Sequence, residues 1–291
     1  MINVLFQSIT PEVFVGLAFC FGLVVGSFLN VVILRLPQQL YAQWKEHSEE
    51  FLRVPQTAQD GPVETILRPP SKCSECGYAI KPWQNIPLLS YLLLRGRCAN
   101  CSTSISMQYP LVELLTGIMV AVTACYYSGQ VGVLYAVFFT LMLIALAGID
   151  VREKLLPDQM TLPLLWVGLI ANLNGFFVPL PDAVLGTIAG YLALWSVYWL
   201  FKLMTGKEGM GYGDFKLLAA LGAWLGWQML PLVILLSSIV GALVGIFMII
   251  LGGKDRNVQI PFGPFLAAAG WIALIWGDKI MSDYSSAFSL Y

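Results

Sequence analysis

Residues 141–150 read LMLIALAGID, an apolar run that ends in the carboxylic acid Asp150. The run belongs to a longer apolar segment, residues 131–149. A helix needs roughly 20 mostly apolar residues to cross the hydrocarbon core of a bilayer, which is about 30 Å thick. This stretch therefore predicts a membrane-spanning helix that carries an acidic group at one end.

The composition of the whole chain agrees with a membrane protein. Of 291 residues, 58% are hydrophobic and 11% are charged, and the mean hydropathy is +0.75. Soluble domains carry about 25% charged residues. Sixteen Lys and Arg residues balance 17 Asp and Glu residues, so no global field attracts polyanions. Soluble enzymes, disordered proteins and nucleic-acid binders are excluded, and an all-α polytopic membrane protein with lipid around it is expected.

The hydropathy pattern predicts about eight transmembrane helices. Residues 1–11 contain no Lys or Arg, so the first apolar stretch is expected to stay as a span and not to be removed as a signal peptide. The predicted spans are 13–34, 108–128, 131–149, 161–179, 183–204, 215–228, 230–252 and 261–278. The sixth is short, so it could be tilted, broken or re-entrant. The predicted parts are a first helix (1–35), a loop domain (36–107) and a transmembrane core (108–291).

The basic residues predict the orientation of these helices. With eight spans, the loops 35–107, 150–160, 205–214 and 253–260 lie on one side, and with their flanks they carry 15 of the 16 Lys and Arg residues. Cytoplasmic loops carry an excess of Lys and Arg. We therefore predict that these loops are cytoplasmic and that both termini are outside.

Four cysteines in the first loop have the spacing of a metal site. Cys73 and Cys76 form one Cys-x-x-Cys pair, Cys98 and Cys101 form another, and 21 residues separate the pairs. Two such pairs are typical of a structural site in which four thiolates bind Zn²⁺. Disulfides are disfavoured in the cytoplasm. The sequence predicts a small zinc-ribbon-like module, with redox cysteines or a site that has lost its metal as alternatives.

Two aspartates are the strongest candidates for catalysis. The chain has a single histidine, so neither a Ser-His-Asp triad nor a His-Glu-x-x-His site is plausible. Asp150 ends the third span and Asp214 begins the sixth, with one span out and one span back between them. Both should therefore reach the same membrane face. Two close carboxylates share a proton, which is the chemistry of aspartyl proteases.

Other residues are predicted to support this pair. Gly211 and Gly213 give the backbone before Asp214 freedom to approach a peptide closely. Asp158, after Leu156-Pro157, could cap the helix that follows or support the site locally.

The sequence resembles the type IV prepilin peptidases, also called leader peptidase/N-methyltransferases, over nearly the whole chain. The matching segments are Gly26-Ser27-Phe28-Leu29-Asn30-Val31-Val32 with Arg35 and Pro37, both cysteine pairs, Tyr109-Pro110 with Glu113, Asp150 with Leu156-Pro157-Asp158, Gly209 to Lys216, and Pro261-Phe262-Gly263-Pro264. The four cysteines indicate the bifunctional branch of this family.

The resemblance implies an enzyme of the bacterial inner membrane. It would cut the basic leader from prepilins and type II secretion pseudopilins after a glycine, with Asp150 and Asp214 as the catalytic pair and Lys216 nearby. It would then methylate the new N-terminus with S-adenosylmethionine. Asn30, Arg35 and Glu113 are candidates for methyl transfer because they are predicted to face the same side. The alternative is a membrane transporter or assembly factor with a zinc ribbon, in which the aspartates bind an ion.

Overall fold

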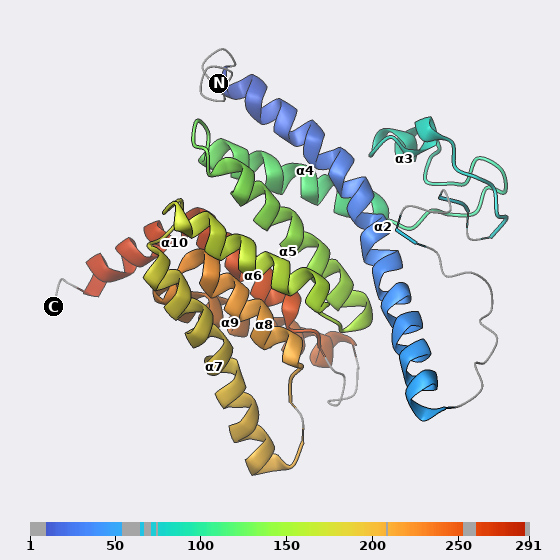
Figure 1. The fold of residues 1–291 in the computed structure, drawn as a ribbon. Helices are drawn as coiled ribbons and strands as arrows, with labels where there is room; N and C mark the ends of the chain where they lie inside the picture. The colour runs from blue at the N-terminus through green and yellow to red at the C-terminus, as the bar shows by residue number, and fades with distance from the viewer. Residues whose placement is uncertain are drawn as a thin grey trace. The chain divides into compact units, whose positions relative to one another are not determined.

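The computed structural model describes residues 10–53, 65–66, 71–73, 75–207, 209–252 and 260–288, and these are almost entirely helical (Figure 1). They contain no β-strand, only two isolated β-bridges. The chain divides into two compact units, Met1–Cys125 and Tyr126–Tyr291. The expected helical architecture is confirmed, and each unit is described by itself below.

The first unit is built on two long helices that pack closely together. They are α2 (Pro11–Leu52) and α4 (Gln108–Tyr126). A Cβ atom placed on Gly22 would lie 2.8 Å from the Cα of Gly117, and one on Gly26 would lie 2.9 Å from the Cα of Glu113. Glycine at this i, i+4 spacing therefore lets the two backbones approach, as small residues do in membrane helices.

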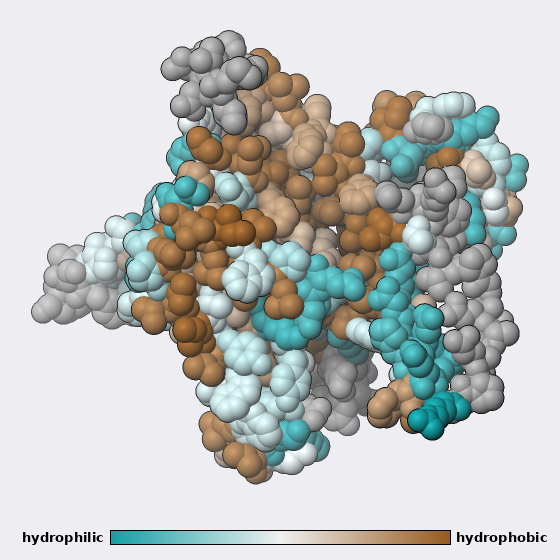
Figure 2. Space-filling model, viewed as in Figure 1, coloured by the Kyte–Doolittle hydropathy of each residue, from teal (hydrophilic) through white to brown (hydrophobic). Residues whose placement is uncertain are grey.

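Helix α2 extends well beyond the span predicted for it. The predicted span ends at residue 34, whereas the helix continues through Pro37 to Leu52. The side chains of α2 change from mostly apolar to mostly polar along the helix, and the last part includes Lys45, Glu46 and Glu50. Figure 2 shows this change as brown side chains on the first half of α2 and teal side chains toward its C-terminal end. Helical periodicity thus persists after the apolar run has ended.

The second unit surrounds one short buried helix, α8 (Tyr212–Leu225). Every residue of α8 from Asp214 to Leu225 except Lys216 is buried. Its neighbours are α6 (Asp158–Leu173), α7 (Leu180–Thr205) and α10 (Gly263–Phe288), while α5 (Val133–Glu153) packs on α10 and α6, and α9 (Leu230–Gly252) packs on α10. Protein on all sides explains why a helix of 14 residues is apolar around its whole circumference.

Glycines and one tryptophan set the packing around α8. A Cβ atom on Gly190 of α7 would lie 2.6 Å from the carbonyl oxygen of Leu218, so α7 and α8 touch through their backbones. On the α6 side, the fully buried Trp224 donates its indole N–H to the carbonyl of Leu164 at 2.8 Å. The helix ends at Gly226, where φ of +78° favours glycine. These contacts fix the position of α8, and so of Asp214, relative to α6 and α7.

Six described helices are long and apolar enough to cross a membrane. They are Pro11–Leu52, Gln108–Tyr126, Val133–Glu153, Leu180–Thr205, Trp227–Met248 and Gly263–Ala287. The other two predicted spans correspond to α6 and α8, which have 16 and 14 residues. The chain is therefore a multi-pass membrane protein, and the total of eight spans stays a prediction.

Candidate functional site

Asp150 lies in the last turn of α5, and its side chain is held by the start of α10. The residue is 4% exposed, and its Oδ2 accepts the backbone N–H of Gly263 at 2.9 Å. A Cβ atom on Gly263 would lie 2.6 Å from that oxygen. Only glycine at this position therefore lets the backbone N–H reach the carboxylate.

Asp214 lies in the first turn of α8 and is also buried, with 8% of its surface exposed. Gly211 precedes the helix as its N-cap, and the backbone N–H of Asp214 donates to the Gly211 carbonyl at 3.3 Å. A Cβ atom on Gly213 would lie 2.7 Å from the Cβ of Leu156. Gly213 is therefore needed for close packing against Leu156. The sequence alone predicted that this glycine gives the backbone conformational freedom.

Leu156 connects the two halves of this site. Its side chain lies beside Gly213, which precedes Asp214, and beside Gly263, which binds Asp150. Asp150 is near enough to act electrostatically on Asp214. The structure thus brings together two carboxylates that are 64 residues apart, in a setting that permits the sharing of one proton.

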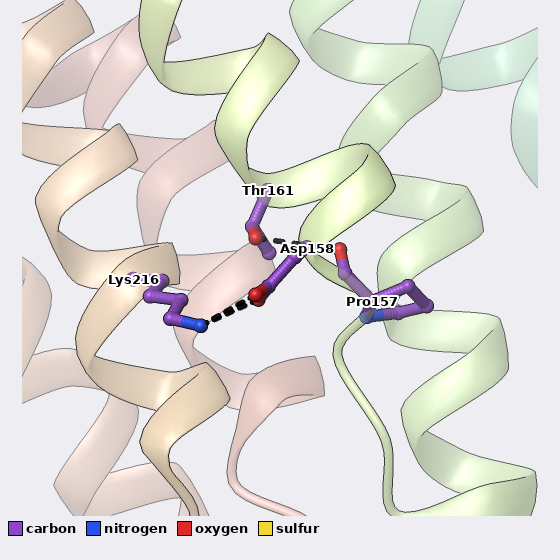
Figure 3. A network of polar contacts seen from close by, with 4 residues as sticks. All are labelled: Pro157, Asp158, Thr161 and Lys216. Atoms are coloured by element: carbon purple, nitrogen blue, oxygen red, sulfur yellow. Dashed lines mark hydrogen bonds and ion pairs between the residues drawn. The ribbon is translucent and has the colours of Figure 1, made fainter. Parts of the chain in front are cut away.

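Asp158 and Lys216 form an ion pair between the first turns of α6 and α8 (Figure 3). The Lys216 ammonium lies 2.6 Å from Oδ1 and 2.7 Å from Oδ2 of Asp158. Asp158 is the first residue of α6, and no side-chain cap bond is present at that end. The pair fixes the start of α8 two residues after Asp214, so both residues support the site from outside it.

We expect the charge reversal of this ion pair to test its positioning role. Asp158→Lys or Lys216→Asp alone should lower cleavage of a leader peptide about 5-fold, because a half-exposed pair is worth about 1 kcal/mol. The double variant Asp158→Lys/Lys216→Asp should recover most of the wild-type kcat. Equal losses in the single and double variants would contradict the role of the pair.

Gly263→Ala is expected to damage the site more than the loss of the ion pair. The added methyl group would occupy the space beside Asp150 Oδ2, so the carboxylate has to turn away from the Gly263 N–H. We expect kcat for leader cleavage to fall about 100-fold, since a misplacement of about 1 Å can cost that much. Gly16→Ala, where a Cβ atom meets nothing within 4 Å, is the matched control and should retain wild-type kcat.

The four cysteines of the first unit converge on one point. Their sulfur atoms all lie within 4.8 Å of one another. Cys73 Sγ is 3.8 Å from Cys101 Sγ, and Cys76 Sγ is 4.0 Å from Cys98 Sγ. Four sulfurs at about 2.3 Å from a tetrahedral Zn²⁺ are about 3.8 Å apart, so the residues fit this ion.

The two cysteine loops have the same backbone structure. In the first, the Cys73 N–H donates to the Tyr78 carbonyl and the Gly77 N–H donates to the Cys73 carbonyl. In the second, the corresponding donors are Cys98 and Ser102, and the acceptors are Thr103 and Cys98. Each loop is closed by one β-bridge, Lys72 with Ala79 and Arg97 with Ser104. The recurring Cys-x-x-Cys predicted the metal site, whereas the equivalent backbone structure of the two loops was not predicted.

One cysteine is prepared for metal binding. A hydrogen bond with the side chain of Thr103 lowers the pKa of the Cys101 thiol to about 6. The thiolate is the form that binds metal. The Thr103 contact therefore favours the thiolate form of Cys101.

The three candidates for methyl transfer occupy two different environments in the first unit. Asn30 and Glu113 are buried between α2 and α4, at 2% and 8% exposure. The Arg35 guanidinium instead donates to the backbone carbonyls of Thr65 at 3.0 Å and Ile66 at 3.5 Å. Arg35 therefore ties a loop segment to α2, which indicates a structural contribution.

Sequence reasoning did not assign roles to Gly263 and Leu156 beside the aspartates. Gly263 acts through its backbone N–H, which any sequence position offers, so only its place in Pro261-Phe262-Gly263-Pro264 could have drawn attention to it. Leu156 is one apolar residue among many. Neither has a side-chain chemistry that predicts its position.

Comparisons with known proteins match both units. A family described as the bacterial peptidase A24 N-terminal domain matches residues 20–127, and the type IV leader peptidase family matches residues 137–246. Similar curated relatives are each named prepilin leader peptidase/N-methyltransferase. The protein from Aeromonas hydrophila is 54% identical over 96% of both chains, that from Pseudomonas putida is 52% identical over 96% of both, and that from Pseudomonas aeruginosa is 51% identical over 94% of both. No solved structure matches the chain significantly.

Proposed function

The chain belongs to the type IV leader peptidase family, and on that premise we propose that Asp150 and Asp214 are the carboxylates with which it cleaves leader peptides from prepilins. Relatives that share half of its residues over nearly their whole length are named prepilin leader peptidase/N-methyltransferase. The chain is therefore a membrane-embedded peptidase and methyltransferase. Membership in this family favours an enzyme over a transporter or assembly factor.

The observation that carries the proposal is the meeting of two buried aspartates at the ends of two helices. Asp150 ends a candidate span and Asp214 begins the central helix of the same unit. Burial of a carboxylate in an apolar setting costs free energy. A buried carboxylate without a charged partner is therefore a candidate for a functional residue. Asp150 accepts the Gly263 N–H, and among the described residues neither carboxylate forms an ion pair.

This arrangement supports acid–base hydrolysis of a peptide. One carboxylate, in its ionised form, takes a proton from a water molecule as the oxygen attacks the scissile carbonyl. The other carboxylate, in its protonated form, donates to the carbonyl oxygen. The first carboxylate then gives the proton that it took from water to the amide nitrogen, the carbon–nitrogen bond breaks, and one hydroxyl of the tetrahedral intermediate returns its proton to the second carboxylate as the new carboxyl group forms. The Gly263 N–H holds Asp150 in one rotamer during these steps. The pair therefore needs no metal ligand or nucleophilic side chain.

The substrate chemistry fits a site at the ends of helices. A prepilin has a basic leader in the aqueous phase and an apolar helix that can stay in the bilayer. Its scissile bond then lies at the interface, where a helix begins or ends. Incubation of the purified full-length chain with a prepilin should release the leader after its glycine, and an intact substrate would contradict the proposal. Pseudopilins with the same junction are expected to be cut as well.

We assign one structural Zn²⁺ to Cys73, Cys76, Cys98 and Cys101. The fit of the sulfur separations to a tetrahedral site and the two equivalent loops support this assignment. When bound, the ion supplies a rigid link between loops that have little apolar core of their own. It is given no part in the hydrolysis.

The N-methyltransferase activity requires a methyl donor, for which we propose S-adenosylmethionine. The first unit is its expected location, because the second unit already contains the aspartates. Asn30 and Glu113 are the proposed polar residues of this site, while Arg35 supports the neighbouring loop.

We place the protein in the bacterial inner membrane with the aspartates at the cytoplasmic face and both termini in the periplasm. The distribution of Lys and Arg supports this orientation, because 15 of 16 lie in or beside the loops on one side of an eight-span arrangement.

Cysteine labelling tests the orientation. In a variant without Cys20 and Cys125, a membrane-impermeant thiol reagent should label Ser128→Cys in intact spheroplasts but not Thr205→Cys. Both positions are exposed on the protein, and they lie near opposite ends of predicted spans. Labelling of both after permeabilisation is the control. The reverse pattern in intact spheroplasts would place the aspartates outside and contradict the orientation.

A further inference from the structure

Between α2 and α4 there is a buried oxygen for which no hydrogen bond is available among the described residues. It is Oδ1 of Asn30, a side chain that is 2% exposed. Buried polar atoms in folded proteins nearly always have a partner, so an exception needs an explanation. The oxygen accepts no bond from either helix and is free to accept one from a ligand.

The orientation of the Asn30 amide is determined by its surroundings. Its Nδ2 donates to the carbonyl of Gly26 on its own helix at 3.3 Å and to the carbonyl of Tyr109 on α4 at 3.1 Å. Both partners are acceptors only, so the nitrogen has to face them and the oxygen cannot take its place. The unpartnered atom is therefore an acceptor, and the missing group is a donor.

A carboxylate lies one helical turn away in the same seam. Glu113 follows Tyr109 by four residues on α4, a rise of about 6 Å, and its Cα packs against Gly26. Glu113 Oε2 accepts the N–H of Leu88 at 2.9 Å, and the Ser27 hydroxyl also bonds to this carboxylate. A carboxylate has about four acceptor positions, so it can accept further donors.

The backbone beside Glu113 is held in an unusual conformation. Leu88 has φ of +57° and ψ of −47°, values that a leucine rarely adopts. The bond from its N–H to Glu113 is one of the contacts that hold it there. The carboxylate is thus fixed in place from both the loop and α2.

From the unpartnered Asn30 oxygen and the fixed Glu113 carboxylate we infer that the seam between α2 and α4 is a binding site for a primary ammonium group. An ammonium has three donors and no acceptor. Two of its tetrahedral N–H donors, each making a bond of about 2.8 Å, reach acceptors about 4.6 Å apart, so one ammonium can bridge two neighbouring acceptors. The site thus offers an unpartnered acceptor and a carboxylate in the same seam.

This inference rests on the proposed methyl transfer, which involves two primary amines. One is the new N-terminus of the cleaved substrate, and the other is the α-amino group of S-adenosylmethionine. Both present the same chemistry to Asn30 and Glu113. The experiment therefore has one arm for each.

The test measures binding to the full-length protein in detergent, without turnover. The first arm compares a mature pilin peptide that has a free N-terminus with its N-acetylated form. The second arm compares S-adenosylhomocysteine with its desamino analogue. In the wild type, the ligand with the amine should bind at least 10-fold more tightly in one of the two arms.

Glu113→Gln and Asn30→Leu should remove that preference, so that the two ligands of the arm bind within 2-fold of each other. A general loss of structure would weaken both ligands alike and leave their ratio unchanged. Thr116→Val is the matched control, because Thr116 is buried in the same seam and its hydroxyl bonds only to its own helix at Val112. It should keep the wild-type ratio.

The arm in which the preference is lost identifies the source of the amine. Retention of the preference by both Glu113→Gln and Asn30→Leu would overturn the inference, as would a wild type that shows no preference in either arm. The proposed methyl transfer is assayed separately, by incorporation of labelled methyl groups into the cleaved peptide. The wild type can transfer methyl groups while the variants keep the wild-type ratio of affinities for ligands with and without the amine. That result would refute the ammonium site and leave the proposed methyl transfer intact.

Discussion

Asp150→Asn and Asp214→Asn are each expected to reduce leader cleavage by about 10³-fold or more, while the protein still inserts and binds substrate. An amide can neither take a proton from water nor share one with the remaining aspartate, so both steps of the hydrolysis fail together. The measurement is single-turnover cleavage of a prepilin by the purified variants. Equal losses in the two variants are expected because the carboxylates act as a pair.

Asp182→Asn is the matched control for this prediction. Asp182 lies in the first turn of α7, where Oδ1 accepts the indole N–H of Trp227 at 3.1 Å. It is therefore an aspartate of the same unit that contributes to structure and not to the site. Its cleavage rate should stay within 2-fold of the wild type. Near-normal turnover by either Asp150→Asn or Asp214→Asn would show that the catalytic pair is assigned wrongly.

Cys73→Ser and Cys98→Ser are expected to abolish metal binding and methyl transfer while cleavage falls only in part. Four thiolates contribute about 10–16 kcal/mol of apparent Zn²⁺ binding free energy in small metal-folded modules. The loop residues pack few apolar side chains, so the loss of one ligand should unfold the module. Elemental analysis should find about one zinc per wild-type chain and almost none in the variants.

Cys125→Ser is the control for the cysteine variants. Cys125 lies near the end of α4, outside the four-sulfur cluster, and should be replaceable with zinc content and both activities unchanged. Cleavage should persist in Cys73→Ser because Asp150 and Asp214 belong to the other compact unit. A fully active wild type without metal would contradict the zinc assignment and indicate a redox or methyl-transfer role for the cysteines.

Much of the fold could be predicted because each of its signals is local. An apolar run of about 20 residues specifies a membrane helix with no reference to its neighbours. Helices α4, α5, α7, α9 and α10 accordingly overlap five of the predicted spans. The predicted helix ends were least accurate where the hydropathy fell but the helix continued, as in α2 beyond residue 34.

The relation of Asp150 to Asp214 was partly predictable, because two predicted spans lie between them and two crossings would bring both residues to the same membrane face. The even number of predicted spans indicates that the two aspartates share a membrane face, but it does not give the distance between them. The approach of the two carboxylates depends on Leu156, which packs against Gly213 and Gly263 at once, and on the depth at which α8 is buried. These are contacts between segments far apart in the chain, which no local pattern records.

The sequence by itself determined the apolar helices, the cysteine pairs and the two acidic residues at the ends of predicted spans, because hydropathy, ligand spacing and residue order are properties of the chain alone. Only the tertiary structure decided that the Gly263 N–H holds Asp150, that the Lys216 ammonium goes to Asp158 and that Asn30 keeps an oxygen without a partner. Hydrogen bonds and close backbone contacts act over about 3 Å, so they exist only after packing has brought distant residues to that separation.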